Sequence, residues 1–330
     1  MSVQSKNWEG QVREVDAVKK IATRESYGKC LLDMADLFPD MVVLDADLTG
    51  ATKTNLFCKA HPERHINCGI AESNMMGVAA GLAAEGLIPV VSSFAMFAAG
   101  RAYEQVRNSV GYPHLNVKIA ATHGGVSVGE DGASHQCNED LALMRTIPGM
   151  VVINPADDVE ARAALKAALE YEGPVYLRFG RMAVPVFNDE ESYSFEMGKG
   201  VCLRRGRDVT LVATGLCVWE ALRAADRLSQ QGLEAEVINI HTLKPLDAQI
   251  ICDSARRTGR VVAVEEHSII GGLGDAVASA LAQDCPAPLL KIGIEDVYGQ
   301  TGGAKELLEF YGLEEEKIAE RTLRWLKKEA

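Results

Sequence analysis

The chain has 330 residues, long for one domain and sufficient for two, and 47% of them are hydrophobic against 24% charged, a composition typical of soluble globular proteins. Its net charge of −12 argues against a nucleic-acid or anionic-membrane surface, because both need concentrated positive charge. No apolar run reaches the roughly 20 residues of a membrane-spanning helix, and the N-terminus has no signal-peptide core, so we expect no membrane partner and a cytoplasmic location.

The N-terminal segment, residues 1–20, alternates charge and polarity without a period, and we interpret it as an arm or a short helix packed on a neighbour. Thr23 can cap a helix that Pro39 ends. A predicted strand rich in β-branched residues, 41–47, then ends in acidic residues. Because ligands collect at the carboxyl ends of strands in an open parallel sheet, Asp47 is a candidate binding residue, although a turn acid bonded to its own loop is an equal alternative.

Residues 67–77 join a short segment ending at Ile66 to a long helix rich in small residues. Gly69 allows a sharp turn, and Ser73 or Asn74 can cap the helix, so the carboxyl group of Glu72 is held at a corner between strand and helix. Considered alone, Glu72 also suits the first turn of a helix through the helix dipole.

Two further stretches follow predicted strands. Phe94 and Phe97 come after the strand 88–93, where their spacing also suits two core phenylalanines on one helix face. The strand 116–121 precedes a Gly-rich loop, residues 122–136, which contains two histidines and two acids.

The remaining pattern alternates strands with helices, which predicts parallel sheets covered on both faces. The other elements expected before Pro185 are strands at 151–154 and 174–179 and helices at 98–110 and 158–171. Beyond it we expect strands at 208–214, 235–240, 261–265 and 289–294, helices at 216–231 and 247–258, a helix opened by the glycines at 271–274, and two terminal helices. The full Gly-x-Gly-x-x-Gly spacing is absent, which argues against a nicotinamide cofactor. The eight cysteines form no Cys-x-x-Cys pair, so no zinc or redox site is expected.

The glutamate corner, the aromatic pair and the Gly-rich loop, in this order and each after a strand, resemble the pyrimidine-binding half of transketolase. The resemblance covers residues 20–325 and implies two doubly wound α/β domains. It divides the chain into an N-terminal arm (1–20), a pyrimidine-binding domain (21–187), a linker (188–198) and a transketolase C-terminal-type domain (199–330).

The same resemblance implies a site for thiamine diphosphate. In that family a glutamate hydrogen-bonds the aminopyrimidine ring and makes the cofactor's own imino group the base, and Glu72 matches it. A carboxyl group in an apolar, aromatic pocket favours its neutral form, which this task requires. Phe94 and Phe97 match aromatic residues that contact the pyrimidine, and Asp47 is a further cofactor candidate.

For the substrate, His123 and His135 match histidines that contact the sugar, and a neutral imidazole can pass protons during carbon–carbon cleavage. Asp131 matches the acid that reads the donor's hydroxyl group. Arg24 and Arg181 match arginines that bind the substrate phosphate, for which a guanidinium fork is suited.

Three positions leave questions open. Arg178 is a close rival of Arg181 for the phosphate. A third aromatic of many relatives falls near Gly100, and a phosphate-binding serine falls at Ala51, where Thr52 is the alternative.

The diphosphate-and-magnesium motif of this cofactor class, Gly-Asp-Gly, does not occur in the chain. We therefore expect the C-terminal subunit of a split transketolase, inactive alone, with Mg²⁺ bound mainly by an N-terminal partner subunit and no metal ligand assigned to this chain. The expected assembly is α2β2, with contacts between pyrimidine domains that also allow a homodimer. The expected reaction moves a two-carbon ketol unit from a ketose phosphate to an aldose phosphate.

Three alternatives remain at this point. The beta subunit of a 2-oxo-acid dehydrogenase shares the two-domain layout and the glutamate corner, but His135 and the phosphate-type arginines favour transketolase. A fragment of 1-deoxyxylulose-phosphate synthase is disfavoured for the same reason. A catalytically silent assembly subunit is disfavoured by the intact Glu72 and His135.

Overall fold

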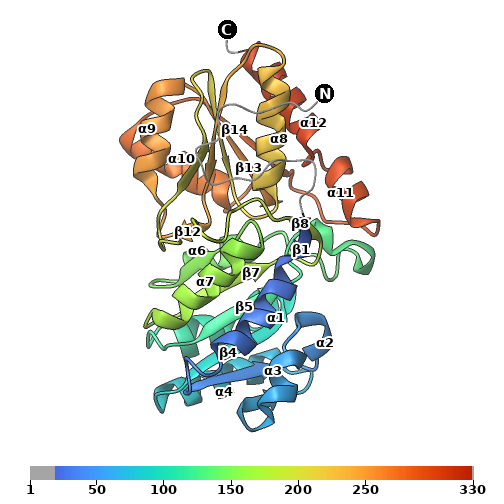
Figure 1. Ribbon diagram of the computed structural model, residues 1–330, viewed down its shortest axis with the longest axis vertical. Helices are drawn as coiled ribbons and strands as arrows, with labels where there is room; N and C mark the ends of the chain where they lie inside the picture. The colour runs from blue at the N-terminus through green and yellow to red at the C-terminus, as the bar shows by residue number, and fades with distance from the viewer. Residues whose placement is uncertain (1–18, 329–330) are drawn as a thin grey trace.

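The computed structural model describes residues 19–328, so most of the predicted N-terminal arm lies outside the described residues. Two sheets lie one above the other along the long axis, with blue-to-green segments below and yellow-to-red segments above (Figure 1). Within the described residues, no helix is long and apolar enough to cross a membrane.

The first sheet has seven strands, and its first six strands in chain order run parallel, as expected from alternating strands and helices. In spatial order the strands are β12 (Thr242–Lys244), β6 (Val151–Ile153), β7 (Val175–Phe179), β5 (Lys118–Thr122), β4 (Ile88–Phe94), β2 (Met41–Asp45) and β3 (His65–Asn67). The associated helices are α1 (Thr23–Met34), α2 (Thr49–Thr52), α3 (Asn55–Ala60), η2 (Pro62–Arg64), α4 (Glu72–Ala84), η3 (Met96–Arg101), α5 (Tyr103–Gln105), η4 (Val106–Gly111), η5 (Val126–Asp131), α6 (Asp140–Thr146) and α7 (Asp158–Glu170).

The second sheet has five strands: β14 (Leu289–Ile294), β13 (Val261–Ser268), β10 (Val209–Ala213), β11 (Ala235–Asn239) and β9 (Val201–Arg204). Its helices are α8 (Cys217–Ser229), α9 (Ala248–Thr258), α10 (Leu273–Asp284), α11 (Ala304–Phe310) and α12 (Glu315–Leu326). A short antiparallel pair, β1 (Lys20–Ala22) with β8 (Ala183–Pro185), brings the start of α1 to the end of the first sheet's last parallel strand.

Both sheets are covered on both faces, which confirms the predicted α/β architecture. Successive strand residues point to opposite faces, so Val43 packs with α1 and α7 whereas Leu44 packs with α4 and α6. In the second sheet, Leu211 faces the side of α8 and α12, and Val212 faces the side of α9 and α10. Each face therefore buries apolar surface against helices, the main driving force for this layered fold.

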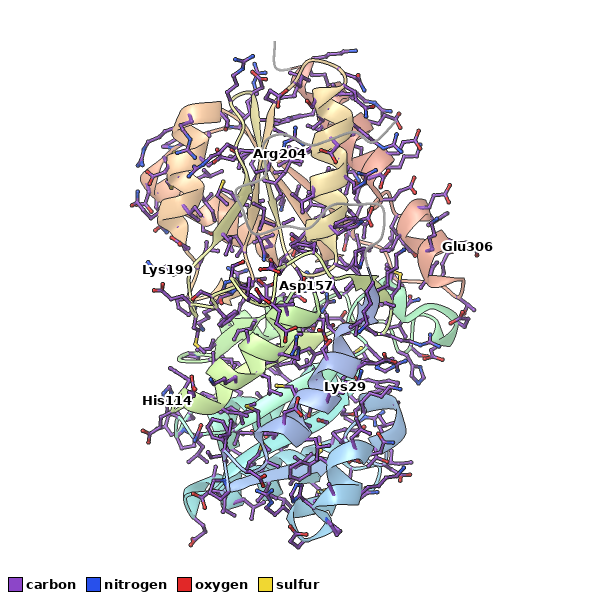
Figure 2. The ribbon with its side chains drawn as sticks, viewed as in Figure 1. Lys29, His114, Asp157, Lys199, Arg204 and Glu306 are labelled. Atoms are coloured by element: carbon purple, nitrogen blue, oxygen red, sulfur yellow. The ribbon has the colours of Figure 1, made fainter. Side chains whose placement is uncertain are left out.

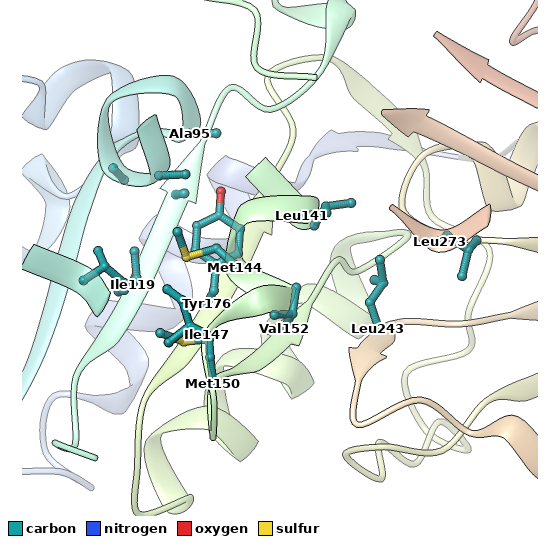
Figure 3. Packing of buried hydrophobic residues seen from close by; sticks show 14 of the residues in the cluster. Ala95, Ile119, Leu141, Met144, Ile147, Met150, Val152, Tyr176, Leu243 and Leu273 are labelled. Atoms are coloured by element: carbon teal, nitrogen blue, oxygen red, sulfur yellow. The ribbon is translucent and has the colours of Figure 1, made fainter. Parts of the chain in front are cut away.

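The two sheets also share buried contacts. One apolar cluster runs from Met144 of α6 and Tyr176 of β7 through Leu243 of β12 to Leu273 of α10, which packs on the second sheet (Figure 3). Asp157, at the start of α7, lies between the two parts (Figure 2), and its carboxylate accepts hydrogen bonds from the backbone N–H groups of Glu160, Phe187 and Asn188. The mouth of the site described below is formed across this junction.

The structure differs from the sequence-based expectations in four places. The outer strands β12 and β9 are antiparallel, and β12 adds a segment from beyond residue 198 to the first sheet. The predicted strand 41–47 ends at Asp45. The predicted helix 98–110 is instead two wide π-helical turns, η3 and η4, separated by the short α5.

The predicted caps are also wrong. Ala22 precedes α1, and the Thr23 hydroxyl accepts a hydrogen bond from the Gly180 N–H at 2.7 Å instead of capping the helix. Ala71 precedes α4, so Ser73 and Asn74 lie inside the first turn, and the Ser73 hydroxyl donates to the Arg101 carbonyl. In both cases the helix starts one or more residues away from the position that would use the side chain as a cap.

Candidate active site

Glu72 is the first residue of α4, at the corner predicted for it. The chain leaves β3 at Asn67 and turns at Gly69, whose φ of 68° lies in the left-handed region that favours glycine. The Glu72 residue is only 1% exposed. Its Oε2 atom accepts a hydrogen bond from Arg101 Nη1 at 2.8 Å, so an ion pair stands where the sequence predicted apolar surroundings.

Phe94 and Phe97 form a stacked pair beside this carboxylate. Phe94 ends β4, and Phe97 lies in the first turn of η3, with ring centroids 5.9 Å apart and planes inclined by 14°. The guanidinium carbon of Arg101 lies 4.7 Å from the centroid of the Phe97 ring. One planar cation therefore contacts both Phe97 and Glu72.

Arg101 was missed in the sequence analysis, although a signal was present. It follows Phe97 by four residues, and side chains at this spacing lie on one face of a helical turn. Gly100, where many relatives are expected to have an aromatic side chain, adjoins it, and a Cβ atom there would lie 2.3 Å from Met96 Cε. The wall beside Gly100 is thus filled by Met96.

His123 packs directly on Phe94, with ring centroids 3.8 Å apart. Its Nε2 atom lies 3.1 Å from Arg24 Nη1, and its Nδ1 atom lies 2.8 Å from the Thr122 hydroxyl. Because a guanidinium only donates, Nε2 is the acceptor and the ring proton resides on Nδ1. Burial, with the nearby Arg24 and Arg181 charges, lowers the pKa of His123 to about 3, so its imidazole is neutral at physiological pH.

His135 completes a cluster of four rings. Its ring meets Phe97 edge-on at a centroid distance of 5.4 Å and Phe94 at 6.2 Å, and its Nδ1 atom lies 3.0 Å from the Ser134 hydroxyl. The structure thus brings together both predicted histidines and both predicted phenylalanines, which come from segments following two adjacent parallel strands, β4 and β5.

Arg24 and Arg181 lie at the His123 side of this cluster. Burial lowers the pKa of Arg24, and the positive charge of Arg181 lowers it further. The two guanidinium groups are therefore close enough to repel one another. Arg24 also donates to the Ala51 carbonyl at 3.1 Å, and Arg181 donates to Glu130 Oε2 at 2.9 Å and to the Val128 carbonyl. Both cations retain solvent access, so an anionic group can reach them.

The structure excludes two rivals for the anion. Arg178 is 4% exposed, and its guanidinium donates to Asp140 Oδ2 at 2.9 Å and to the Cys137 carbonyl at 3.1 Å. Thr52 is fully buried, and its hydroxyl bonds to the Leu48 carbonyl and to the Thr54 hydroxyl. Both side chains are buried and already hydrogen-bonded, unlike Arg24 and Arg181.

Two predicted acids, Asp131 and Asp47, are exposed. Asp131 is exposed at the end of η5, and no hydrogen bond or ion pair within residues 19–328 involves its side chain. Asp47 is exposed, with φ at 61°, and its Oδ1 atom accepts a hydrogen bond from Asn67 Nδ2 at 3.3 Å. Their proposed contacts with substrate and cofactor stay predictions.

A cavity of about 760 Å³ opens beside the rings. Phe97, Arg101 and Ser134 line it from the first sheet's side, and Ser268 and Tyr298 line it from the second sheet's side. This volume lies in the range of small-molecule and cofactor sites, which occur preferentially where two domains meet.

The residues present fit an aminopyrimidine ring. The guanidinium of Arg101 is itself a flat nitrogen group that lies over Phe97 and donates an N–H to Glu72, which shows that this place accepts a planar N–H donor. Within residues 19–328, no group of three or more His, Cys, Asp or Glu side chains is arranged to hold a metal ion.

Comparisons with known proteins find matches to both parts of the chain. The transketolase pyrimidine-binding domain matches residues 19–186, and the transketolase C-terminal domain matches residues 198–318. A putative transketolase C-terminal section from Methanocaldococcus jannaschii is 51% identical over 308 residues, covering 93% of this chain and 96% of that protein. A 6-deoxy-6-sulfo-D-fructose transketolase subunit from Clostridium sp. is 45% identical over 296 residues, covering 89% of this chain and 91% of that protein.

Among solved structures, a split gene transketolase described as an inactive beta4 tetramer superimposes with a TM-score of 0.85 at 50% identity. The match covers 94% of this chain and 99% of that one.

Proposed function

Because this chain belongs to the transketolase family and corresponds to its C-terminal section, we propose that it is one subunit of a thiamine-diphosphate-dependent transketolase. Together with a separate N-terminal subunit, it transfers a two-carbon ketol unit from a ketose phosphate to an aldose phosphate. The observation that carries the proposal is Glu72, which is buried at a helix start and bonded to Arg101, the side chain that lies over the Phe97 ring.

When bound, thiamine diphosphate supplies an electron sink that allows a carbon–carbon bond beside a carbonyl group to break and to form. Glu72 is placed to hydrogen-bond the pyrimidine and to hold a proton there. Phe97 offers the flat apolar contact, and offset stacking on such a ring contributes roughly 0.5–1.5 kcal/mol beyond area burial. Asp47 remains a proposed cofactor contact.

His123 is neutral in the free chain, so its ring has one hydrogen-bond donor and one acceptor. Its Nδ1 proton is held by Thr122, and its Nε2 lone pair is taken by Arg24 in the free chain. When Arg24 turns to an anionic substrate, Nε2 becomes available to the sugar hydroxyl groups. His135, with Asp131 as a further proposed contact, lies on the other side of the ring pair and completes the proposed sugar site.

Arg24 and Arg181 form the proposed site for the substrate's anionic group. The chain has a net charge of −12, but the positive charges of these two arginines act on a bound anion at short range. Their attraction outweighs the repulsion from the more distant negative charges, which solvent and salt screen. The Clostridium relative is named for a sulfonated sugar, and a sulfonate presents the same anionic oxygens to a guanidinium as a phosphate does. The trial substrates therefore include both kinds of sugar.

The partner subunit is proposed to supply the diphosphate and Mg²⁺ contacts, because the chain lacks Gly-Asp-Gly. We propose an α2β2 assembly in which pyrimidine domains meet, and the same contacts allow a homodimer of this chain alone.

The test is to co-express the chain with the product of its neighbouring reading frame and to assay two-carbon transfer with thiamine diphosphate and Mg²⁺. The expected result is transfer by the pair and none by either chain alone. Decarboxylation of a 2-oxo acid without ketol transfer would instead support a 2-oxo-acid dehydrogenase subunit, and no turnover with any donor would support a silent assembly subunit.

A further inference from the structure

We propose that Arg101 occupies the pyrimidine position of the cofactor site in the free chain and leaves it when the cofactor binds. The proposal rests on the proposed function and adds a competition between a side chain and the cofactor. Its basis is that one side chain already makes both contacts assigned to the pyrimidine ring.

The first contact is with the aromatic pair. Phe94 is only 7% exposed, and it packs against His123 and Phe97. Phe97 is the ring that lines the cavity, and Arg101 lies over it at 4.7 Å. A ring stacking on Phe97 from the cavity therefore meets the guanidinium first.

The second contact is with the carboxylate. Arg101 Nη1 donates to Glu72 Oε2 at 2.8 Å, and Arg101 is the sole hydrogen-bond partner of the Glu72 carboxylate within residues 19–328. Glu72 Oε1 has no hydrogen-bond partner among the described residues, so the competition concerns Oε2 and the Phe97 face that Arg101 covers. A pyrimidine ring that stacks on Phe97 and bonds to Oε2 needs the space that the guanidinium fills.

Arg101 is free to move aside. Its side chain is 51% exposed, and Glu72 is its one ion-pair partner among the described residues. It ends η3, a π-helical turn, and such turns often occur at functional sites. Turning the guanidinium into solvent breaks one ion pair and one cation–π contact and leaves the backbone unchanged.

The competition has a measurable cost for the cofactor. A half-exposed ion pair together with a cation–π contact favours the closed arrangement by roughly tenfold. A ligand that needs the open arrangement has its apparent affinity reduced by the fraction of open molecules. Removing the Arg101 side chain is therefore expected to tighten cofactor binding by about tenfold.

The experiment titrates thiamine diphosphate, with Mg²⁺ present, into the complex of this chain with its partner subunit by isothermal calorimetry. Arg101→Ala is compared with Arg101→Lys, which keeps the charge but not the flat fork, and with Arg107→Ala. Arg107 is an exposed arginine on the next turn, so its variant controls for the loss of one positive charge near an anionic ligand. Thermal melting checks that each variant folds.

The expected order of affinity is Arg101→Ala tightest, Arg101→Lys intermediate, and Arg107→Ala equal to the unchanged complex. Equal or weaker binding by Arg101→Ala would overturn the inference while leaving the proposed function in place, provided that the unchanged complex binds the cofactor and transfers ketol units. A complex that binds no thiamine diphosphate would overturn both.

Discussion

Replacing Glu72 with Gln tests the centre of the proposed site. The amide keeps the shape of the side chain but cannot hold the proton that the proposed contact with the pyrimidine requires. Loss of a cofactor-activating group is expected to cost more than the 10²–10⁴ in rate typical of one general acid or base. A loss above about 10⁴ corresponds to more than roughly 5.4 kcal/mol of activation free energy.

The fold is expected to survive this change. Glu72 contributes one ion pair, and its partner Arg101 is 51% exposed, so the pair is worth at most about 1 kcal/mol to the free energy of unfolding. A domain is typically stabilised by about 5–15 kcal/mol. Catalysis and stability therefore separate clearly in this variant.

The assay measures two-carbon transfer by the complex with its partner subunit, alongside thermal melting of each variant. Glu85→Gln is the matched control, because Glu85 is an exposed glutamate at the opposite end of the same helix. It is expected to retain full activity. Near-native transfer by Glu72→Gln would refute the assignment of Glu72, and a large drop in its melting temperature would refute the stability argument.

Three further predictions follow from the same structure. Arg181→Ala is expected to raise KM for a phosphorylated acceptor by one to two decades, since a charge-assisted contact is worth roughly 1.5–3 kcal/mol, and to change KM little for an unphosphorylated acceptor. The control is Glu130→Gln, which removes only the ion-pair partner of Arg181. Equal losses on both acceptors would show that Arg181 has a structural role. Sedimentation of the active complex is expected to give an α2β2 tetramer, and a stable αβ heterodimer with full activity would contradict it. Burial raises the pKa of Glu160 from 4.5 to about 7, so the folded state keeps a proton that the unfolded state releases, and stability is expected to fall by up to roughly 3 kcal/mol as pH rises from about 4.5 to 7. Denaturant unfolding at both ends of this range should show a smaller fall in Glu160→Gln, and an unchanged fall would exclude Glu160 as its source.

Local sequence patterns determined much of this protein. Consecutive apolar residues such as Val43 and Leu44 specify strands that are buried on both faces, and the order of strands and helices specifies the parallel sheets. Gly69 and Glu72 mark the corner between β3 and α4 because a left-handed turn and a helix start each depend on a few adjacent residues. These features need no information from distant parts of the chain.

Contacts between distant residues were decided only by the tertiary structure. Arg178 and Arg181 are equivalent in the sequence, but the buried Asp140 binds Arg178 and leaves Arg181 beside the site. The predicted Thr23 cap of α1 was wrong for the same reason. The Thr23 hydroxyl accepts a hydrogen bond from the N–H group of Gly180, a residue 157 positions away. The antiparallel edge β12 depends on where the second sheet packs against the first.

The site shows the same division. The sequence identified Glu72, Phe94, Phe97, His123 and His135 as residue types in a recognisable order. The neutral state of His123 and the ion pair of Glu72 with Arg101 arise from partners that only folding brings together. Side-chain charge and proton position depend on such neighbours and on burial, and neither can be obtained from the order of residues along the chain.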